Sequence, residues 1–281
     1  MRTRFLSKCT DVEVTQYLDS NDIIIIPVGV TELHGGLPAD SETVMAEALA
    51  LKMAEACDGL VLHNLPYFYA GSTVRGKSTV QVPVQASIAY LLEISKSLIR
   101  QGFRRQIFVT THGPAHIYIS PVVREIFDEY NIPILYIDPL HKIGDTNFFE
   151  LMASANSEDP FTEMILGAYD ILGRLDDVPL TTPDNDFWSE RKPSTTSFAS
   201  KVNGMAFQSG AMGMIFGDTM DHMPTMYLES DEQKAELAVS GRELIDKIVA
   251  AFDMPEVVKQ MKEVDVFVQE QASKYPWTQR R

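Results

Sequence analysis

Cysteine is scarce in this chain of 281 residues, which contains only Cys9 and Cys57, far apart from each other. Two isolated cysteines provide neither a disulfide framework nor the paired spacing of a zinc ribbon. Long hydrophobic runs are also missing: the start has no apolar stretch of signal-peptide length, and nowhere do about eighteen apolar residues follow one another. We therefore expect a cytoplasmic protein without a membrane-spanning segment.

Basic residues are few relative to acidic ones. The chain has 24 Lys and Arg against 39 Asp and Glu, which gives a formal net charge of −15. A phosphate backbone or an anionic membrane surface would be repelled by this charge. The sequence therefore disfavours nucleic acid and lipid as partners. A hydrophobic content of 45% in a chain of this length is enough for a sizeable core.

Strand-like and helix-like segments alternate in the first half of the chain. Apolar, β-branched runs predict strands at residues 23–28, 60–65, 106–110 and 132–137, and helical spacing predicts helices at residues 41–57, about 88–101 and 121–130. Nearly unbroken apolar strands are typical of strands buried on both faces, and intervening helices imply parallel pairing with right-handed crossovers. We predict an α/β fold, a three-layer α/β/α arrangement with a mostly parallel central sheet.

The second half is less regular. A helix is expected at residues 162–172, and two more follow, one at residues 231–252 and another from Pro255 onward. Between them, the polar stretch 181–200 is interpreted as a long loop, within an irregular region at about 175–215. Loops of that length are often functional or contact a neighbouring subunit. We assign residues 1–281 to a single domain.

Two of the six histidines directly precede a glycine at the carboxyl end of a predicted strand. His34 follows the first strand and His112 the third, and in parallel sheets ligands gather at this edge. Glu32 lies two residues before His34, so in an extended segment both side chains point to the same side. A carboxylate beside imidazoles suits zinc, manganese or iron(II). The alternative is that Glu32 and His34 are ordinary polar loop residues, but His112 on a second strand end favours a metal site.

Three segments resemble the creatininase (creatinine amidohydrolase) family. Residues 27–43, PVGVTELHGGLPADSET, resemble its opening motif, residues 102–105 and 111–116, GFRR and THGPAH, its second motif, and residues 231–241 its C-terminal helix. The resemblance implies a creatininase-like fold and a metal-dependent amidohydrolase that cleaves a non-peptide C–N bond of a small cyclic amide or formamide-like substrate. It also implies one or two divalent ions (Zn, Mn or Fe) per subunit and a homo-oligomer, a hexamer.

By the resemblance, Glu32, His34 and His112 are metal ligands. The family's bridging aspartate corresponds to Glu42, with Asp40 as the alternative, because this chain is one residue shorter between His34 and Leu37. Glu42 could instead be an N-terminal helix carboxylate favoured by the helix dipole.

Catalytic residues are less directly matched. The family's H-A-G-E segment corresponds best to residues 156–163, NSEDPFTE, which has no histidine. In this alignment Asp159 takes the position of the family's ligand glutamate. A small shift of the alignment would put Glu158 or Glu163 there instead. All three could also be solvated acids at the start of a helix. His116 is a candidate proton carrier, with a satisfied or surface histidine as the alternative. The predicted catalytic residues are His116 and Asp159.

The remaining candidates have weaker signals. We interpret His63 as structural, His141 as a neighbour of the site without a role, and His222 as a substrate contact; Tyr67, Tyr69 and Arg75 fit either the site rim or packing. Nucleophile-elbow, dinucleotide-binding and P-loop patterns are missing, so covalent acyl transfer, dinucleotide binding and phosphoryl transfer lack support. Two alternative functions stay open: a metal-dependent lyase or isomerase, and a catalytically silent binding or scaffold subunit.

Overall fold

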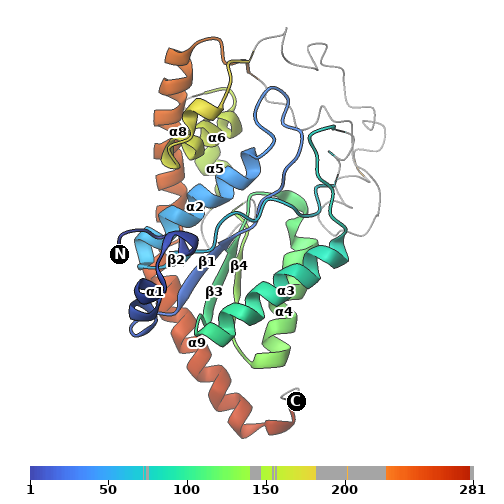
Figure 1. The fold of residues 1–281 in the computed structure, drawn as a ribbon, viewed down its shortest axis with the longest axis vertical. Coiled ribbons are helices and arrows are strands. Elements are labelled where there is room, and N and C mark those ends of the chain that lie inside the picture. Colours follow the sequence, from blue (N-terminus) through green and yellow to red (C-terminus); the bar gives the residue numbers. More distant parts are fainter. Residues whose placement is uncertain are drawn as a thin grey trace.

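The computed structural model describes residues 1–71, 73, 76–139, 147–153, 155, 157–181, 201 and 226–278. In this part of the chain, four strands form one sheet in the order β2-β1-β3-β4 (Figure 1). The strands are β1 (Ile23–Pro27), β2 (Leu60–Val61), β3 (Arg105–Val109) and β4 (Leu135–Ile137). Every adjacent pair is parallel, so the predicted parallel sheet is confirmed, with β1 and β3 at its centre.

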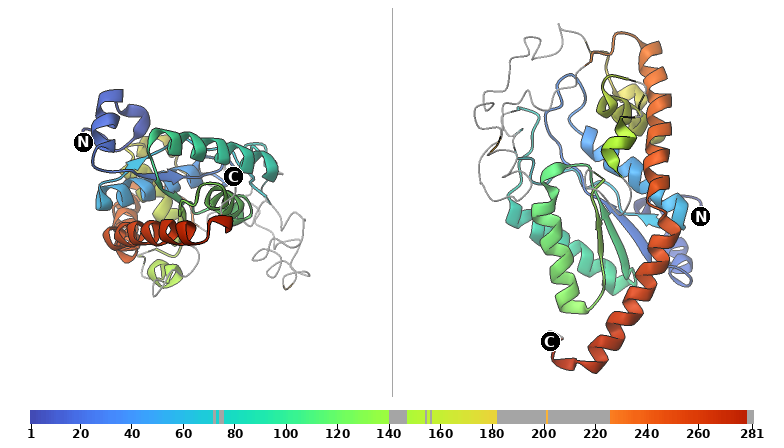
Figure 2. Two further views of the ribbon diagram at one scale, coloured as in Figure 1. Left: turned by 90° about the horizontal axis from the view of Figure 1, so that it is seen from below. Right: turned by 180° about the vertical axis from the view of Figure 1, so that it is seen from behind.

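Helices cover both faces of the sheet (Figure 2). One face carries α2 (Ser41–Cys57), α5 (Phe148–Met152), α6 (Pro160–Ile171), α8 (Asp231–Ala251) and α9 (Met254–Lys274), and the other carries α1 (Asp11–Leu18), α3 (Val84–Gln101) and α4 (His116–Tyr130). Short 3-10 helices occupy Leu6–Lys8, Gly113–Ala115, Leu175–Asp177 and Pro276–Thr278. The three-layer α/β/α prediction is confirmed.

The alternation of side chains along β1 divides the core in two. Ile23 and Ile25 pack with the α2 and α8 layer, whereas Ile24 and Ile26 pack with the α3 and α4 layer. Successive residues of a strand point to opposite faces, so an apolar run without polar interruptions fills both halves at once.

Some element ends differ from the sequence-based prediction. α4 begins at His116 instead of Pro121, because Pro121 lies inside the helix rather than at its start. At that position the proline removes a single backbone bond, the one to the carbonyl of Ile117. β2 ends after two residues, and Asn64 just beyond it has a left-handed φ of 71° and donates its N–H to Glu47. β4 starts after Pro133, which cannot donate to a ladder.

Two glycines permit a very close crossing of α6 and α8. A Cβ added at Gly241 would lie 1.9 Å from the carbonyl oxygen of Glu163, and one added at Gly167 would lie 2.2 Å from the carbonyl carbon of Gly241. The two backbones therefore touch directly, which only residues without a side chain allow.

Parts of the sequence-based picture fall outside the described residues. These include residues 182–200 of the expected loop and most of the irregular region; the described start of that region contains the 3-10 helix Leu175–Asp177. At its end, the N–H of Thr181 donates to the carbonyl of Leu228, and Leu228 donates back to the Thr181 hydroxyl. The single-domain assignment stays a prediction. Within the described residues, we find no helix of the length and apolarity needed to span a bilayer.

Candidate metal centre

The segment that leaves β1 presents Glu32 and His34 at the carboxyl edge of the sheet. The N–H of Glu32 donates to the carbonyl of Ala39 at 2.8 Å, which closes residues 32–39 into a loop. Within this loop Gly35 has a left-handed φ of 61°, and Leu37 donates to the carbonyl of His34 at 3.0 Å. The glycine allows the tight turn that holds His34 beside the strand end.

The first turn of α2 is pressed against the same strand end. A Cβ added at Gly29 would lie 2.4 Å from the Cα of Thr43, so the glycine makes room for the helix. The Thr43 hydroxyl then donates to the carbonyl of Val30 at 3.0 Å. This attachment places Glu42, the neighbour of Thr43, over the end of the sheet.

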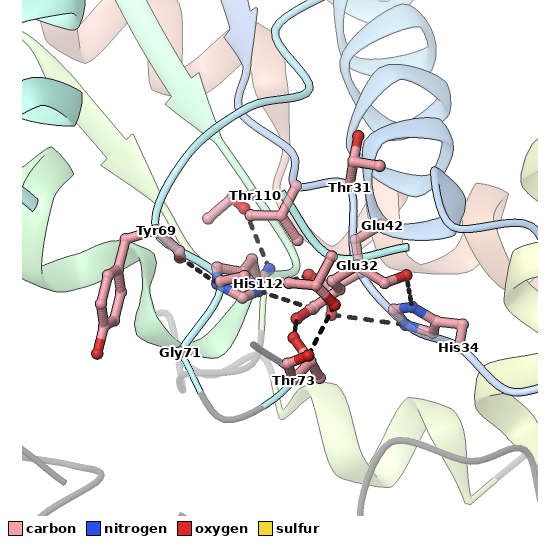
Figure 3. Close-up of polar contacts among 12 residues, drawn as sticks. Thr31, Glu32, His34, Glu42, Tyr69, Gly71, Thr73, Thr110 and His112 are labelled. Carbon is pink, nitrogen blue, oxygen red and sulfur yellow. Dashed lines mark hydrogen bonds and ion pairs between the residues drawn. The ribbon is translucent and has the colours of Figure 1, made fainter. Parts of the chain in front are cut away.

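Glu32, His34, Glu42 and His112 converge at this edge (Figure 3). Ligand atoms of the first three lie within 4.8 Å of one another, and all three side chains are buried. One oxygen of Glu42, Oε2, lies 2.6 Å from Nδ1 of His112, and the other, Oε1, lies 3.9 Å from Nε2 of His34. Oε1 of Glu32 lies 3.4 Å from Nδ1 of His112. Glu42 therefore stands between two imidazoles.

Backbone carbonyls orient both imidazoles. Nε2 of His112 donates to the carbonyl of Tyr69 at 2.9 Å, and Nδ1 of His34 donates to the carbonyl of Glu32 at 3.4 Å. Because a carbonyl only accepts hydrogen bonds, these two nitrogens carry hydrogen. The other ring nitrogen of each histidine faces Glu42. Metal-binding histidines are held in this way, with one nitrogen donating to the surroundings and the other directed at the ion.

The cluster contains two buried carboxylates, those of Glu32 and Glu42. Burial lowers the pKa of His112, but the Glu42 and Glu32 carboxylates outweigh this effect and raise the pKa well above 6.5. Two buried carboxylates thus require positive charge next to them, which a protonated His112 supplies. A divalent cation would meet the same requirement, and carboxylate with imidazole is a donor set that suits zinc, manganese or iron. The residues therefore fit a metal.

Comparison with known proteins agrees with this chemistry. The family model described as "Creatininase: Creatinine amidohydrolase" matches residues 7–165, which is more than half of the chain. The chain belongs to the creatininase family. The resemblance found in the sequence is thereby confirmed.

Among curated proteins, the 3-dehydro-scyllo-inosose hydrolase of Thermotoga maritima is 30% identical over 141 residues, or 48% of this chain and 43% of the relative. The chain thus aligns with less than half of that relative's length. Solved structures include "Creatininase Mn", with a TM-score of 0.61 at 16% identity over 92% of this chain and 98% of that one. A glutamate-to-glutamine creatininase variant titled as the Zn-Zn type has a TM-score of 0.51 at 16% identity over 89% and 98%. These likenesses show the shared fold.

Asp40, the alternative to Glu42, is held elsewhere. Its Oδ2 accepts from Nη2 of Arg174 at 2.9 Å, and its Oδ1 accepts from the hydroxyl of Tyr169. Both oxygens are thus engaged by α6 and the residues that follow it. Glu42 is the carboxylate that the structure brings to the two histidines.

The predicted catalytic residues have hydrogen-bond partners other than the four proposed ligands. Asp159 caps α6: one carboxylate oxygen accepts the N–H of Thr162 at 3.2 Å and the other accepts its hydroxyl at 2.8 Å. Glu163 is buried and accepts the N–H of Ser157, while Glu158 is exposed. None of these three is among the ligand atoms of the Glu32, His34 and Glu42 group. The catalytic role of Asp159 stays a prediction.

His116 starts α4, one turn after His112. Its Nδ1 donates to the carbonyl of Gly113 at 2.9 Å, and its Nε2 is buried without a hydrogen-bond partner among the described residues. A nitrogen prepared in this way suits proton transfer, but the role stays a prediction.

Three of the other candidates, His63, Tyr67 and Tyr69, belong to the described part of the chain. His63 lies beside the Phe5 ring, at a centroid distance of 4.7 Å, and near the Ser7 hydroxyl, as expected for a structural histidine. Tyr67 is exposed, whereas the side chain of Tyr69 packs against the core and its carbonyl accepts from His112. His141, His222 and Arg75 lie outside the described residues.

Sequence reasoning missed Thr73. This fully buried residue donates its hydroxyl to Oε2 of Glu32, 41 residues earlier in the chain (Figure 3). A lone threonine in a loop carries no chemical pattern that could have identified it.

Proposed function

We propose that this chain is a metal-dependent hydrolase that cleaves a C–N bond of a small cyclic amide or a formamide-like substrate. The observation that carries the proposal is the position of Glu42, whose two oxygens face two different histidines. A carboxylate in that place can bind one ion with either imidazole or be shared by two ions. Membership of the creatininase family supports the same chemistry.

Glu32, His34, Glu42 and His112 would hold the metal. A bound divalent ion supplies Lewis-acid activation of water and of a carbonyl group. The manganese and Zn-Zn forms of creatininase that share this fold support manganese and zinc, and iron suits the same donor set. The backbone carbonyls of Tyr69 and Glu32 orient the two imidazoles, and the loop of residues 32–39 and the start of α2 hold the carboxylates at the sheet edge.

Proton transfer to the leaving nitrogen is assigned to His116, with Asp159 as the acidic candidate. The hydrogen bond from Nδ1 of His116 to the Gly113 carbonyl leaves Nε2 as the nitrogen that can exchange a proton. A positioned acid or base of this kind contributes about 10²- to 10⁴-fold in rate.

A second substrate class is favoured by the Thermotoga maritima relative, whose name specifies 3-dehydro-scyllo-inosose. That name describes a ring ketone, whose hydrolysis would add water to a ring carbonyl and break the adjacent C–C bond, with a proton taken up by the leaving carbon, whereas a cyclic amide would lose its C–N bond. Creatinine itself is disfavoured, because the opening motif is one residue shorter than the family's and the family's histidine near Asn156 is missing.

The test is metal analysis of the purified protein, followed by assays of the metal-loaded protein on cyclic amides, formamides and 3-dehydro-scyllo-inosose in heavy-oxygen water. We expect product that carries solvent oxygen from one of these classes and negligible turnover of creatinine. Product without solvent oxygen would indicate a lyase or isomerase, and protein without transition metal would indicate a silent binding subunit. Creatinine turnover at the rate of a dedicated enzyme would overturn the substrate assignment.

The proposal includes a cytoplasmic homo-oligomer, a hexamer by family resemblance. Light scattering on the purified protein tests this part, with six chains expected and a monomer as the contradicting result.

A further inference from the structure

Tyr69 and Thr73 lie beside the metal centre and each contacts one of its proposed ligands. The Tyr69 carbonyl accepts from Nε2 of His112 at 2.9 Å, and the Thr73 hydroxyl donates to Oε2 of Glu32. Figure 3 shows Tyr69 on the side of His112 away from His34, and Thr73 below Glu32. These two nearby residues thus orient an imidazole and a carboxylate that follow two different strands.

Thr73 is itself held in place by a small network. Its carbonyl accepts from the N–H of Gly76 at 2.8 Å and from the hydroxyl of Thr79 at 2.7 Å. The Thr79 oxygen in turn accepts the N–H of Leu33 at 3.0 Å, and Leu33 is the direct neighbour of Glu32. Thr79 therefore links the backbone of Thr73 to that of Leu33, and this link holds the Thr73 hydroxyl next to Glu32.

The backbone after Tyr69 is anchored separately. Oε1 of Gln81 accepts the N–H groups of Ala70 and Gly71, at 3.0 and 3.2 Å. This bridge sets the position of the Tyr69 carbonyl next to them.

The two oxygens of Glu32 have different surroundings. Oε2 accepts from Thr73, whereas Oε1 faces Nδ1 of His112 at 3.4 Å. We propose that Thr73 is a positioning residue that holds Glu32 as a one-oxygen metal ligand, with Oε2 kept on the hydroxyl and Oε1 directed at the ion. This inference rests on the proposed metal centre.

The position of Thr73 argues against a mere packing role. The residue is fully buried, and its hydroxyl meets a carboxylate rather than a neutral acceptor. Hydrogen bonds to a charged acceptor are the stronger kind, and partners that orient a ligand commonly change metal affinity 10- to 100-fold when removed.

The experiment compares Thr73→Val, which keeps the shape but removes the hydroxyl, with Thr73→Ser, which keeps the hydroxyl. Each protein is stripped of metal and titrated with Co²⁺, with affinity and visible absorption spectrum as readouts. We expect Thr73→Val to bind Co²⁺ about 10- to 100-fold more weakly. Its spectrum should shift and weaken, because release of Oε2 permits a higher coordination number. Thr73→Ser should restore both, and Thr15→Val on α1, which loses an exposed hydroxyl, should match the wild type.

Wild-type affinity and spectrum in Thr73→Val would overturn the inference, and so would equal losses in Thr73→Val and Thr73→Ser, which would point to packing. If Thr73→Val does not fold, Thr79→Val replaces it, with a smaller change in the same direction expected and an unchanged spectrum as the contradicting result. Failure of the wild type to bind Co²⁺ would instead refute the proposed metal centre itself, so the two failures are distinguishable.

Discussion

Replacing Gly241 with alanine should separate two helices of the core. The added Cβ would lie 1.9 Å from the carbonyl oxygen of Glu163, whereas ordinary contact begins at about 3.4 Å, a shortfall of 1.5 Å. The obstructing atoms belong to the backbone of α6, so no side-chain rotation can relieve the clash. Alanine is intrinsically favoured over glycine in a helix by about 1 kcal/mol. Overpacking of this kind costs about 1–3 kcal/mol, and a gap opened along both helices loses further dispersion contacts.

We therefore expect a net destabilisation of about 2 kcal/mol, equivalent in a chain of this length to a decrease in melting temperature of about 3–4 °C. Urea unfolding followed by circular dichroism measures the first quantity and a thermal melt the second. Glu236→Ala, at an exposed position of the same helix, is the matched control and should change stability by less than about 0.5 kcal/mol. A Gly241→Ala protein as stable as the wild type would refute the close crossing.

Four further predictions concern the site. Metal binding near neutral pH should release protons, because the carboxylates keep the pKa of His112 well above 6.5 in the metal-free protein; calorimetry in buffers of different ionisation enthalpy measures this, and no release at pH 7 would contradict it. The same raised pKa of His112 stabilises the metal-free protein fully below about pH 6.5, and this stabilisation is lost progressively as the pH rises through the folded-state pKa. Urea unfolding at several pH values should therefore show a free energy of unfolding that decreases with pH, and His112→Asn should flatten this dependence. Glu42→Gln should weaken metal binding at least 10-fold, whereas Asp40→Asn should keep the metal and lower the free energy of unfolding; equal metal loss in both would restore Asp40 as a ligand. His116→Gln should lower turnover about 10²- to 10⁴-fold with metal content unchanged, and undiminished turnover would remove His116 from the mechanism.

Much of the fold was predictable because its signals are local. The run of four isoleucines in β1 predicts a buried strand by itself, and the apolar spacing of residues 41–57 predicts a helix. The helix α2 has the predicted bounds. Element ends were harder, since they depend on neighbours. The start of α4 lies at His116 because the structure tolerates Pro121 inside the helix, whereas a proline in a sequence usually marks a first turn.

The site was predictable where chemistry and position coincide. Glu32, His34 and His112 follow the ends of adjacent parallel strands, so topology alone brings them near one another. The sequence favoured Glu42 by resemblance and left Asp40 as the alternative, and the structure adds that Arg174, more than a hundred residues away, engages Asp40. Tyr69 acts through its carbonyl, a group that every residue possesses, so its identity carries no signal.

Metal content after reconstitution tests the central claim most directly. The wild type and the control His63→Ala should hold one or two ions per chain by elemental analysis. Glu32→Ala, His34→Ala and His112→Ala should each lose most of the metal, because each removes a ligand from the same cluster. Circular dichroism should stay native in all of them, since these side chains belong to loops above the sheet. Full metal occupancy in a folded His112→Ala protein would contradict the account.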